Sequence, residues 1–139
     1  MASGQPSFLY VEDDIASREV MEILITGIMG FPQLTIFDTS ANFLERLNSL
    51  PTIPDVIFLD IHIKPYNGYE LFDMIQKSAA FEKTIVVAIT ASVMSNEVEK
   101  LRSVGFKNLV GKPINPVTFP NKVMDILSGK EVWDASWDM

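Results

Sequence analysis

Short apolar runs alternate with longer amphipathic segments about five times along this chain of 139 residues. Three of the runs are continuously apolar and contain β-branched residues, which is typical of strands buried on both faces. The predicted strands are Phe8–Val11, Leu34–Phe37, Val56–Leu59, Ile85–Ile89 and Asn108–Val110. An order in which strands and helices alternate favours an α/β fold with one parallel sheet, right-handed crossovers and helices on both faces.

The segments between the runs have the periodicity of helices. In the first of them Val20, Leu24 and Ile28 recur at every fourth position, which makes one face apolar. The predicted helices are Ala16–Ile28, Ala41–Leu50, Tyr69–Ser78, Asn96–Val104 and Val117–Leu127.

Cap and breaker residues mark where these helices are expected to begin and end. Ser40 can cap the second helix, and Asn67 precedes Glu70 with the spacing of a reciprocal capping pair for the third. Gly105 is expected to close the fourth helix. Pro120 does not fit the interior of the last helix, so that helix is expected either to begin near it or to have a distorted first turn.

Composition excludes several classes of function. The net charge of −7 opposes binding to a phosphate backbone, so we expect no nucleic-acid partner. The chain has no cysteine, which excludes disulfides, thiolate zinc sites and cysteine nucleophiles and agrees with a cytoplasmic location. No apolar stretch approaches the ~20 residues that span a membrane, and residues 1–4 lack the features of a signal peptide.

Residues that carry chemistry follow four of the predicted strands. Glu12 and Asp13 come directly after the first strand, Asp60 after the third, Thr90 after the fourth and Lys112 shortly after the fifth. The carboxyl ends of parallel strands meet at one edge of a sheet, where open α/β folds bind their ligands. The sequence therefore predicts that three carboxylates, a hydroxyl and an ammonium group lie together.

A carboxylate in such a cluster can act as a nucleophile. It can accept a phosphoryl group and hold it as an acyl phosphate. That chemistry needs a divalent cation to offset the charge of the phosphoryl oxygens, and Mg²⁺ prefers oxygen ligands such as those of Glu12 and Asp13. Lys112 can pair with the phosphoryl group as a point charge, and Thr90 can donate a hydrogen bond to it.

Each of these residues also has an ordinary structural interpretation. Asp60 alone reads as a helix cap or a loop acid, and Thr90 alone as a threonine at the edge of the core. Glu12 and Asp13 could simply favour the positive end of the first helix. The functional interpretation rests on their occurrence together, each at the end of a predicted strand.

Four motifs in this order resemble the receiver domain of bacterial two-component response regulators, and the resemblance covers about residues 7–127. The motifs are Phe-Leu-Tyr-Val-Glu12-Asp13-Asp14, Val-Ile-Phe-Leu-Asp60, Ala-Ile-Thr90-Ala-Ser92 and Gly111-Lys112-Pro113. The resemblance implies a flavodoxin-like (βα)5 three-layer sandwich, with a five-stranded parallel sheet in the order 2-1-3-4-5 and the site between strands one and three.

The resemblance also implies a role for each site residue. Asp60 matches the phospho-accepting aspartate, Asp13 the direct Mg²⁺ ligand, and Glu12 its acidic neighbour. His62 matches the position whose backbone carbonyl binds the metal, while its side chain is expected to be exposed. Lys112 matches the lysine of the family, and the bond between it and the following proline is typically cis. Thr90 matches the switch hydroxyl.

Two positions depart from the family pattern. The loop after Asp60 usually has proline at its fourth place, where this chain has Lys64 and then Pro65. The fifth strand often carries an aromatic switch residue three before the lysine, where this chain has Leu109. Phe106 or Tyr66 is a candidate to replace that aromatic side chain.

The leading hypothesis is a signalling phospho-acceptor, not an enzyme, charged with Mg²⁺ by a histidine kinase or a histidine phosphotransfer protein. An aspartate-nucleophile phosphatase would need a second carboxylate at the position of His62. A flavodoxin-like cofactor carrier would need a glycine-rich phosphate loop where residues 12–14 are acidic. A pseudo-receiver, which keeps the fold without switching and serves as a protein-interaction module, is the remaining alternative.

We expect a stand-alone single receiver domain over residues 1–139, with its core at about 7–127 and a tail at 128–139. It is expected to signal through the face formed by the fourth helix, fifth strand and fifth helix, or to pass the phosphoryl group onward. No membrane insertion is expected. Trp133 and Trp137 in the tail either pack on the body of the domain or belong to a frayed end.

Overall fold

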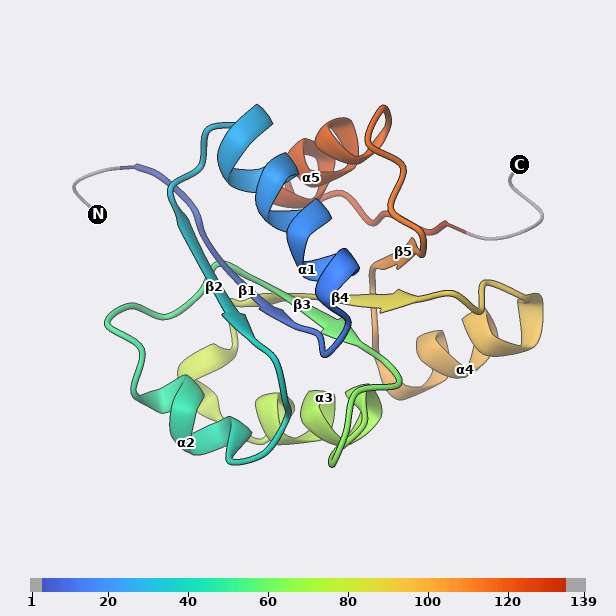
Figure 1. Cartoon of the computed structure of the whole chain (residues 1–139). Coiled ribbons are helices and arrows are strands. Elements are labelled where there is room, and N and C mark those ends of the chain that lie inside the picture. Colours follow the sequence, from blue (N-terminus) through green and yellow to red (C-terminus); the bar gives the residue numbers. More distant parts are fainter. Residues whose placement is uncertain (1–3, 135–139) are drawn as a thin grey trace.

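Five parallel strands form one sheet between two layers of helices in the computed structural model, which describes residues 4–134 (Figure 1). The strands are β1 (Ser7–Val11), β2 (Gln33–Phe37), β3 (Val56–Asp60), β4 (Ile85–Thr90) and β5 (Leu109–Gly111). Their order in the sheet is β2-β1-β3-β4-β5, and every neighbouring pair is parallel. The predicted flavodoxin-like topology is therefore confirmed.

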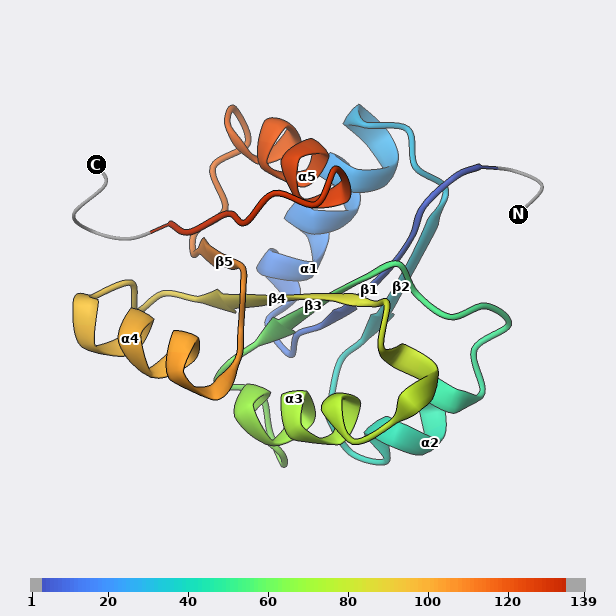
Figure 2. The ribbon, with the colours of Figure 1, turned by 180° about the vertical axis from the view of Figure 1, so that it is seen from behind.

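The helices divide between the two faces of the sheet as right-handed crossovers require. They are α1 (Ile15–Glu22), η1 (Ile23–Ile28), α2 (Phe43–Asn48), α3 (Gly68–Gln76), η2 (Ala79–Phe81), α4 (Ser95–Val104) and α5 (Phe119–Leu127). Figures 1 and 2 show α1 and α5 on one face and α2, α3 and α4 on the other.

The side chains of each strand alternate between two separate apolar cores, one on each face of the sheet. In β1, Phe8 and Tyr10 face the core under α1 and α5, whereas Leu9 and Val11 face the core under α2, α3 and α4. All four side chains are buried. This is why the strands read as continuous apolar runs, since a sheet covered on both faces has no polar side.

The first predicted helix changes its winding midway. The sequence predicts one α-helix over residues 16–28, but α1 ends at Glu22 and a π-helical turn, η1, follows from Ile23. The hydroxyl of Thr26 donates to the carbonyl oxygen of Glu22 at 2.7 Å, so a side chain competes for a group that the regular helix would use. The predicted apolar face of Val20, Leu24 and Ile28 is wrong in part, because Val20 and Ile28 are exposed and only Leu24 is buried. The face that packs on the sheet consists of Met21, Leu24 and Ile25.

The cap predicted for the second helix is wrong, whereas that for the third is confirmed. α2 is shorter than predicted and begins after Asn42, which has a left-handed φ of 55°. The hydroxyl of Ser40 instead contacts both the N–H and the carbonyl oxygen of Tyr66 at 2.7 Å and so braces the loop after β3. Asn67 and Glu70 form the predicted reciprocal capping box at the start of α3.

The last helix begins at Phe119 and not at Val117, because Pro120 fits only the first turn of a helix. Gly105 ends α4 with a φ of 113°, as its position in the sequence predicts. Trp133 packs against the core, while Trp137 lies outside the described residues. Within residues 4–134 no helix combines the length and apolarity that crossing a bilayer requires.

Replacing Gly68 with alanine is expected to destabilise the fold by about 2 kcal/mol, because a Cβ there would overlap its surroundings. It would lie 2.8 Å from the Cα of Ile61 and 3.1 Å from the carbonyl oxygen of Asp60. Urea unfolding of Gly68→Ala measures the loss. Gly27→Ala is the matched control, since a Cβ there has no neighbour within 4 Å. Equal stability of the two variants would contradict this account.

Candidate functional site

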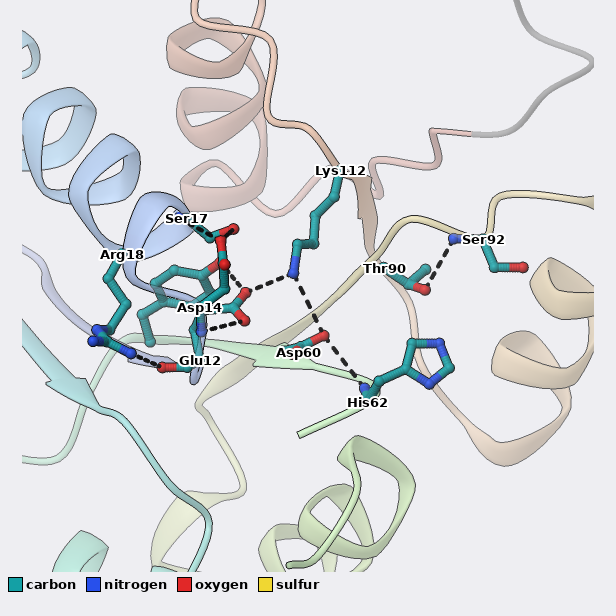
Figure 3. Close-up of polar contacts among 10 residues, drawn as sticks. Glu12, Asp14, Ser17, Arg18, Asp60, His62, Thr90, Ser92 and Lys112 are labelled. Atoms are coloured by element: carbon teal, nitrogen blue, oxygen red, sulfur yellow. Dashed lines mark hydrogen bonds and ion pairs between the residues drawn. The ribbon is translucent and has the colours of Figure 1, made fainter. Parts of the chain in front are cut away.

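The carboxyl ends of four strands carry the predicted residues to one edge of the sheet, and Figure 3 shows Glu12, Asp60, Thr90 and Lys112 there. Glu12 and Asp13 follow β1, Asp60 ends β3, Thr90 ends β4, and Lys112 follows β5. One ligand oxygen each from Glu12, Asp13 and Asp60 lie within 4.8 Å of one another, so these three carboxylates form a group that could hold a metal ion.

Asp60 is almost completely buried, with 5% of its surface exposed. Its Oδ1 accepts a hydrogen bond from the backbone N–H of His62 at 3.3 Å and lies 3.9 Å from the Nζ of Lys112. Burial and the charge of Glu12 raise the pKa of Asp60 to about 7, although Lys112 and the His62 N–H act in the opposite direction. A divalent cation would relieve the repulsion that raises this pKa.

Glu12 is fully buried and is held by three donors. Its Oε1 accepts from the hydroxyl of Tyr10 at 2.7 Å and from Lys112 Nζ at 2.9 Å, and its Oε2 accepts from the N–H of Asp14 at 3.2 Å. The role of Tyr10 was not predicted. The signal for it is that its hydroxyl is the one polar side-chain group of the predicted strand Phe8–Val11 and lies two residues before Glu12, so that both side chains share one face.

Lys112 bridges the two buried carboxylates. Burial lowers the pKa of its ammonium group, but the hydrogen bond to Glu12 and the charge of Asp60 outweigh this and raise that pKa overall. The group therefore stays charged. The backbone N–H of Lys112 donates to the carbonyl oxygen of Thr90 at 2.9 Å, which ties the end of β5 to the end of β4. The bond to Pro113 is cis, as the resemblance implies.

Thr90, at the end of β4, is fully buried. Its Oγ1 accepts a hydrogen bond from the backbone N–H of Ser92 at 3.1 Å (Figure 3). Because the hydroxyl acts as an acceptor in this bond, its own hydrogen is available for an oxygen in the site.

The loop after Asp60 is hydrogen-bonded to the neighbouring loop that follows β2. The carbonyl oxygen of Lys64 accepts from the N–H of Ser40 at 3.1 Å and from the hydroxyl of Thr39 at 3.2 Å. The Lys64–Pro65 bond is cis, which the sequence did not predict. His62 lies in this loop with its side chain exposed, and Figure 3 shows its imidazole extending away from Glu12.

The two residues predicted to replace the missing aromatic side chain occupy other positions. Phe106 is buried and stacks on Phe72 with 4.1 Å between ring centroids. Tyr66 is 42% exposed and belongs to the loop after β3. The aromatic residue that pairs with Leu109 is Trp133, from beyond α5. A switching role for Phe106 or Tyr66 stays a prediction.

The raised pKa of Asp60 predicts how stability depends on pH without Mg²⁺. The folded state keeps a proton on Asp60 between pH 3.8 and about 7, whereas the unfolded chain releases it. Stability from this group is therefore present below that window and is lost as the pH rises through it, by up to about 4 kcal/mol. Asp60→Asn should fold and should lack this loss.

Chemical denaturation in EDTA across this pH range compares the two proteins. The difference between them reports the proton on Asp60 together with its coupling to Glu12 and Lys112, because all other titrating groups are shared. Parallel curves for wild type and Asp60→Asn would contradict the raised pKa.

Removing the hydroxyl of Tyr10 is expected to cost about 1.5 to 3 kcal/mol, the usual range for a hydrogen bond to a charged group. Tyr10→Phe keeps the ring in the core, so the loss comes from Glu12, a buried carboxylate with one donor fewer. Urea unfolding measures it. Tyr66→Phe, on an exposed side chain, should change stability by less than about 0.5 kcal/mol. If Tyr10→Phe unfolded with the same free energy as the wild type, the Tyr10 hydroxyl would not be stabilising Glu12.

Comparison with known proteins identifies the family of the chain. Residues 8–124 match the model of the response regulator receiver domain. The two-component response regulator ORR5 of Oryza sativa subsp. japonica is 28% identical over 115 residues, which cover 81% of this chain and 82% of that protein. The signal transduction histidine-protein kinase BarA of Escherichia coli (strain K12) is 25% identical over 122 residues, or 88% of this chain but only 13% of BarA.

Solved structures share the fold. The signal receiver domain of a DNA binding response regulator protein (merR) from Colwellia psychrerythraea 34H superimposes with a TM-score of 0.77 at 20% identity, covering 89% of this chain and 99% of that one. The chemotaxis response regulator CheY4 of Vibrio cholerae superimposes with a TM-score of 0.74 at 18% identity, covering 88% of this chain and 98% of that one. With its fold, its edge cluster and the family match over residues 8–124, the chain belongs to the response regulator receiver domains of two-component signalling.

Proposed function

We propose that this receiver domain accepts a phosphoryl group on Asp60 from a histidine kinase or a histidine phosphotransfer protein and thereby switches its binding to a partner. The observation that carries this proposal is the position of Lys112 Nζ, 2.9 Å from Glu12 and 3.9 Å from Asp60. A cation held between two buried carboxylates can pair with added negative charge on either of them.

The transfer exchanges one bond to phosphorus for another. A carboxylate oxygen of Asp60 forms a bond to phosphorus as the phosphorus–nitrogen bond of the donor phosphohistidine breaks. The electron pair of the broken bond stays on the imidazole, which takes up a proton. The product is an acyl phosphate at the sheet edge, and the domain acts as a signalling phospho-acceptor, not as a classical enzyme.

The oxygen-rich donor set fits Mg²⁺. Glu12, Asp13 and Asp60 would hold the ion with their carboxylates, and the family resemblance adds the backbone carbonyl of His62. When bound, Mg²⁺ supplies positive charge that offsets the charge on the phosphoryl oxygens. Lys112 and the N–H of His62 already act on Asp60 in the same sense, because both favour its ionised, nucleophilic form.

Phosphorylation changes the partners of Lys112 and Thr90. A phosphoryl group on Asp60 offers Lys112 a stronger charge than Glu12 does, and it offers an acceptor to the hydroxyl of Thr90. Glu12 would then lose Lys112 as a donor. Glu12 would still accept hydrogen bonds from the hydroxyl of Tyr10 and the N–H of Asp14, so the buried carboxylate keeps two donors. Tyr10 therefore lowers the cost of releasing Lys112.

The remaining parts of the proposal rest on the sequence and on the family resemblance. The chain acts as a single receiver domain with its core at about residues 7–127, in the cytoplasm, without inserting into a membrane. The acidic charge supports protein partners and not nucleic acid. The output face consists of α4, β5 and α5.

A pseudo-receiver is the second candidate function. The observation that favours it is Leu109, a fully buried aliphatic residue where the family often has an aromatic switch residue. Such a domain would serve as a protein-interaction module whose binding does not depend on phosphorylation.

Incubation with acetyl phosphate distinguishes these functions. We expect a Mg²⁺-dependent mass gain of one phosphoryl group on Asp60 of the wild type and no gain in EDTA. Asp60→Asn should gain nothing, and Asp73→Asn, which removes an exposed carboxylate from α3, should behave as wild type. Intact mass and peptide mapping measure the result. Absence of the phosphoryl group from the wild type would favour the pseudo-receiver.

A further inference from the structure

The outer edge of β5 is occupied by the chain itself. Glu131–Asp134, which we call the C-terminal strap, runs alongside β5 after α5 and is the last described part of the red segment in Figure 2. Trp133 lies opposite Leu109 in a parallel bridge. The N–H of Leu109 donates to the carbonyl oxygen of Val132 at 2.7 Å, and its carbonyl oxygen accepts from the N–H of Asp134 at 2.9 Å.

Side chains continue this pairing beyond the backbone. Asp134 Oδ2 accepts from the N–H of Gly111 at 2.9 Å, so a carboxylate fills the next place on the edge. The amide oxygen of Asn108 accepts from the N–H of Val132 at 2.8 Å. The strap therefore satisfies the N–H and carbonyl oxygen of Leu109 and the N–H of Gly111, which is how native proteins protect an edge strand.

The strap also contacts both helices that flank β5. The ring of Trp133 lies under the guanidinium of Arg102 in α4, at 4.2 Å from its centroid. Asp134 forms an ion pair at 2.8 Å with Lys122 in α5. Val132 and Trp133 pack against opposite cores, as successive residues of a strand do. One short segment thus covers β5 and reaches α4 and α5 together.

We propose that the C-terminal strap is an intramolecular ligand of the β5 edge, and that the surface beneath it accepts an extended protein segment of the same chemistry. Such a segment would add as a parallel strand and place an aromatic ring under Arg102 and a carboxylate on Lys122. The strap competes with it at a high effective concentration, because it is joined to α5. The proposal concerns the output face but holds whether or not Asp60 is phosphorylated.

Amide hydrogen exchange tests whether the strap is seated. The N–H groups of Leu109 and Gly111 should be protected in the wild type and should exchange about tenfold faster or more in Trp133→Ala/Asp134→Asn. Asp134→Asn alone is a milder variant that should affect Gly111 most. Asp73→Asn, which also removes one carboxylate, is the control and should change neither amide. Exchange of both amides at the rate of unprotected groups in the wild type would overturn the proposal.

Peptide binding tests the surface itself. A fluorescently labelled peptide of residues 129–134 is titrated with each full-length protein and followed by anisotropy. The double variant should bind it about tenfold more tightly than the wild type, whose own strap competes. Equal binding, or no binding to a folded double variant whose Leu109 amide exchanges freely, would overturn the proposal. A wild-type dimer held by exchanged straps, seen by light scattering, would overturn the intramolecular assignment.

Discussion

Two neighbouring carboxylates are buried at the edge of this sheet, and much of the site is arranged around making that possible. Burial of Asp60, and then its repulsion by Glu12, raise the pKa of Asp60. Lys112 offsets part of this repulsion and ties the segment after β5 to Glu12, which follows β1, and to Asp60, which ends β3. Tyr10 satisfies Glu12 from within the core. The polar site is therefore built on the apolar core, not merely beside it.

The strands and the edge cluster could be predicted from the sequence because both depend on local patterns. Apolar runs such as Val56–Leu59 identify buried strands, and the residues that follow them must meet once the strands are parallel and adjacent. The capping pair of Asn67 and Glu70 is equally local. Roles within the cluster came from a family resemblance, which gave Asp13 and His62 their expected functions.

What could not be predicted depends on contacts between distant parts of the chain. Serine is a favoured helix cap, but the hydroxyl of Ser40 instead donates to the loop at Tyr66, because that loop passes within hydrogen-bond distance in the folded protein. The pairing of Trp133 with Leu109 likewise could not be predicted without knowing which edge of the sheet is open. Single residues carry no information about partners 24 or 26 positions away.

The hydrogen bond from Gly111 to Asp134 gives the strap a second consequence. Gly111 precedes Lys112, whose N–H is bonded to Thr90, so one short stretch of main chain links the strap to the cation of the site. Binding equilibria coupled in this way are reciprocal. To whatever extent the charge state of Asp60 shifts the occupancy of the β5 edge, occupancy of that edge must shift the free energy of charging Asp60 by the same amount. A segment that bound the β5 edge in place of the strap would then act on the site to the same extent.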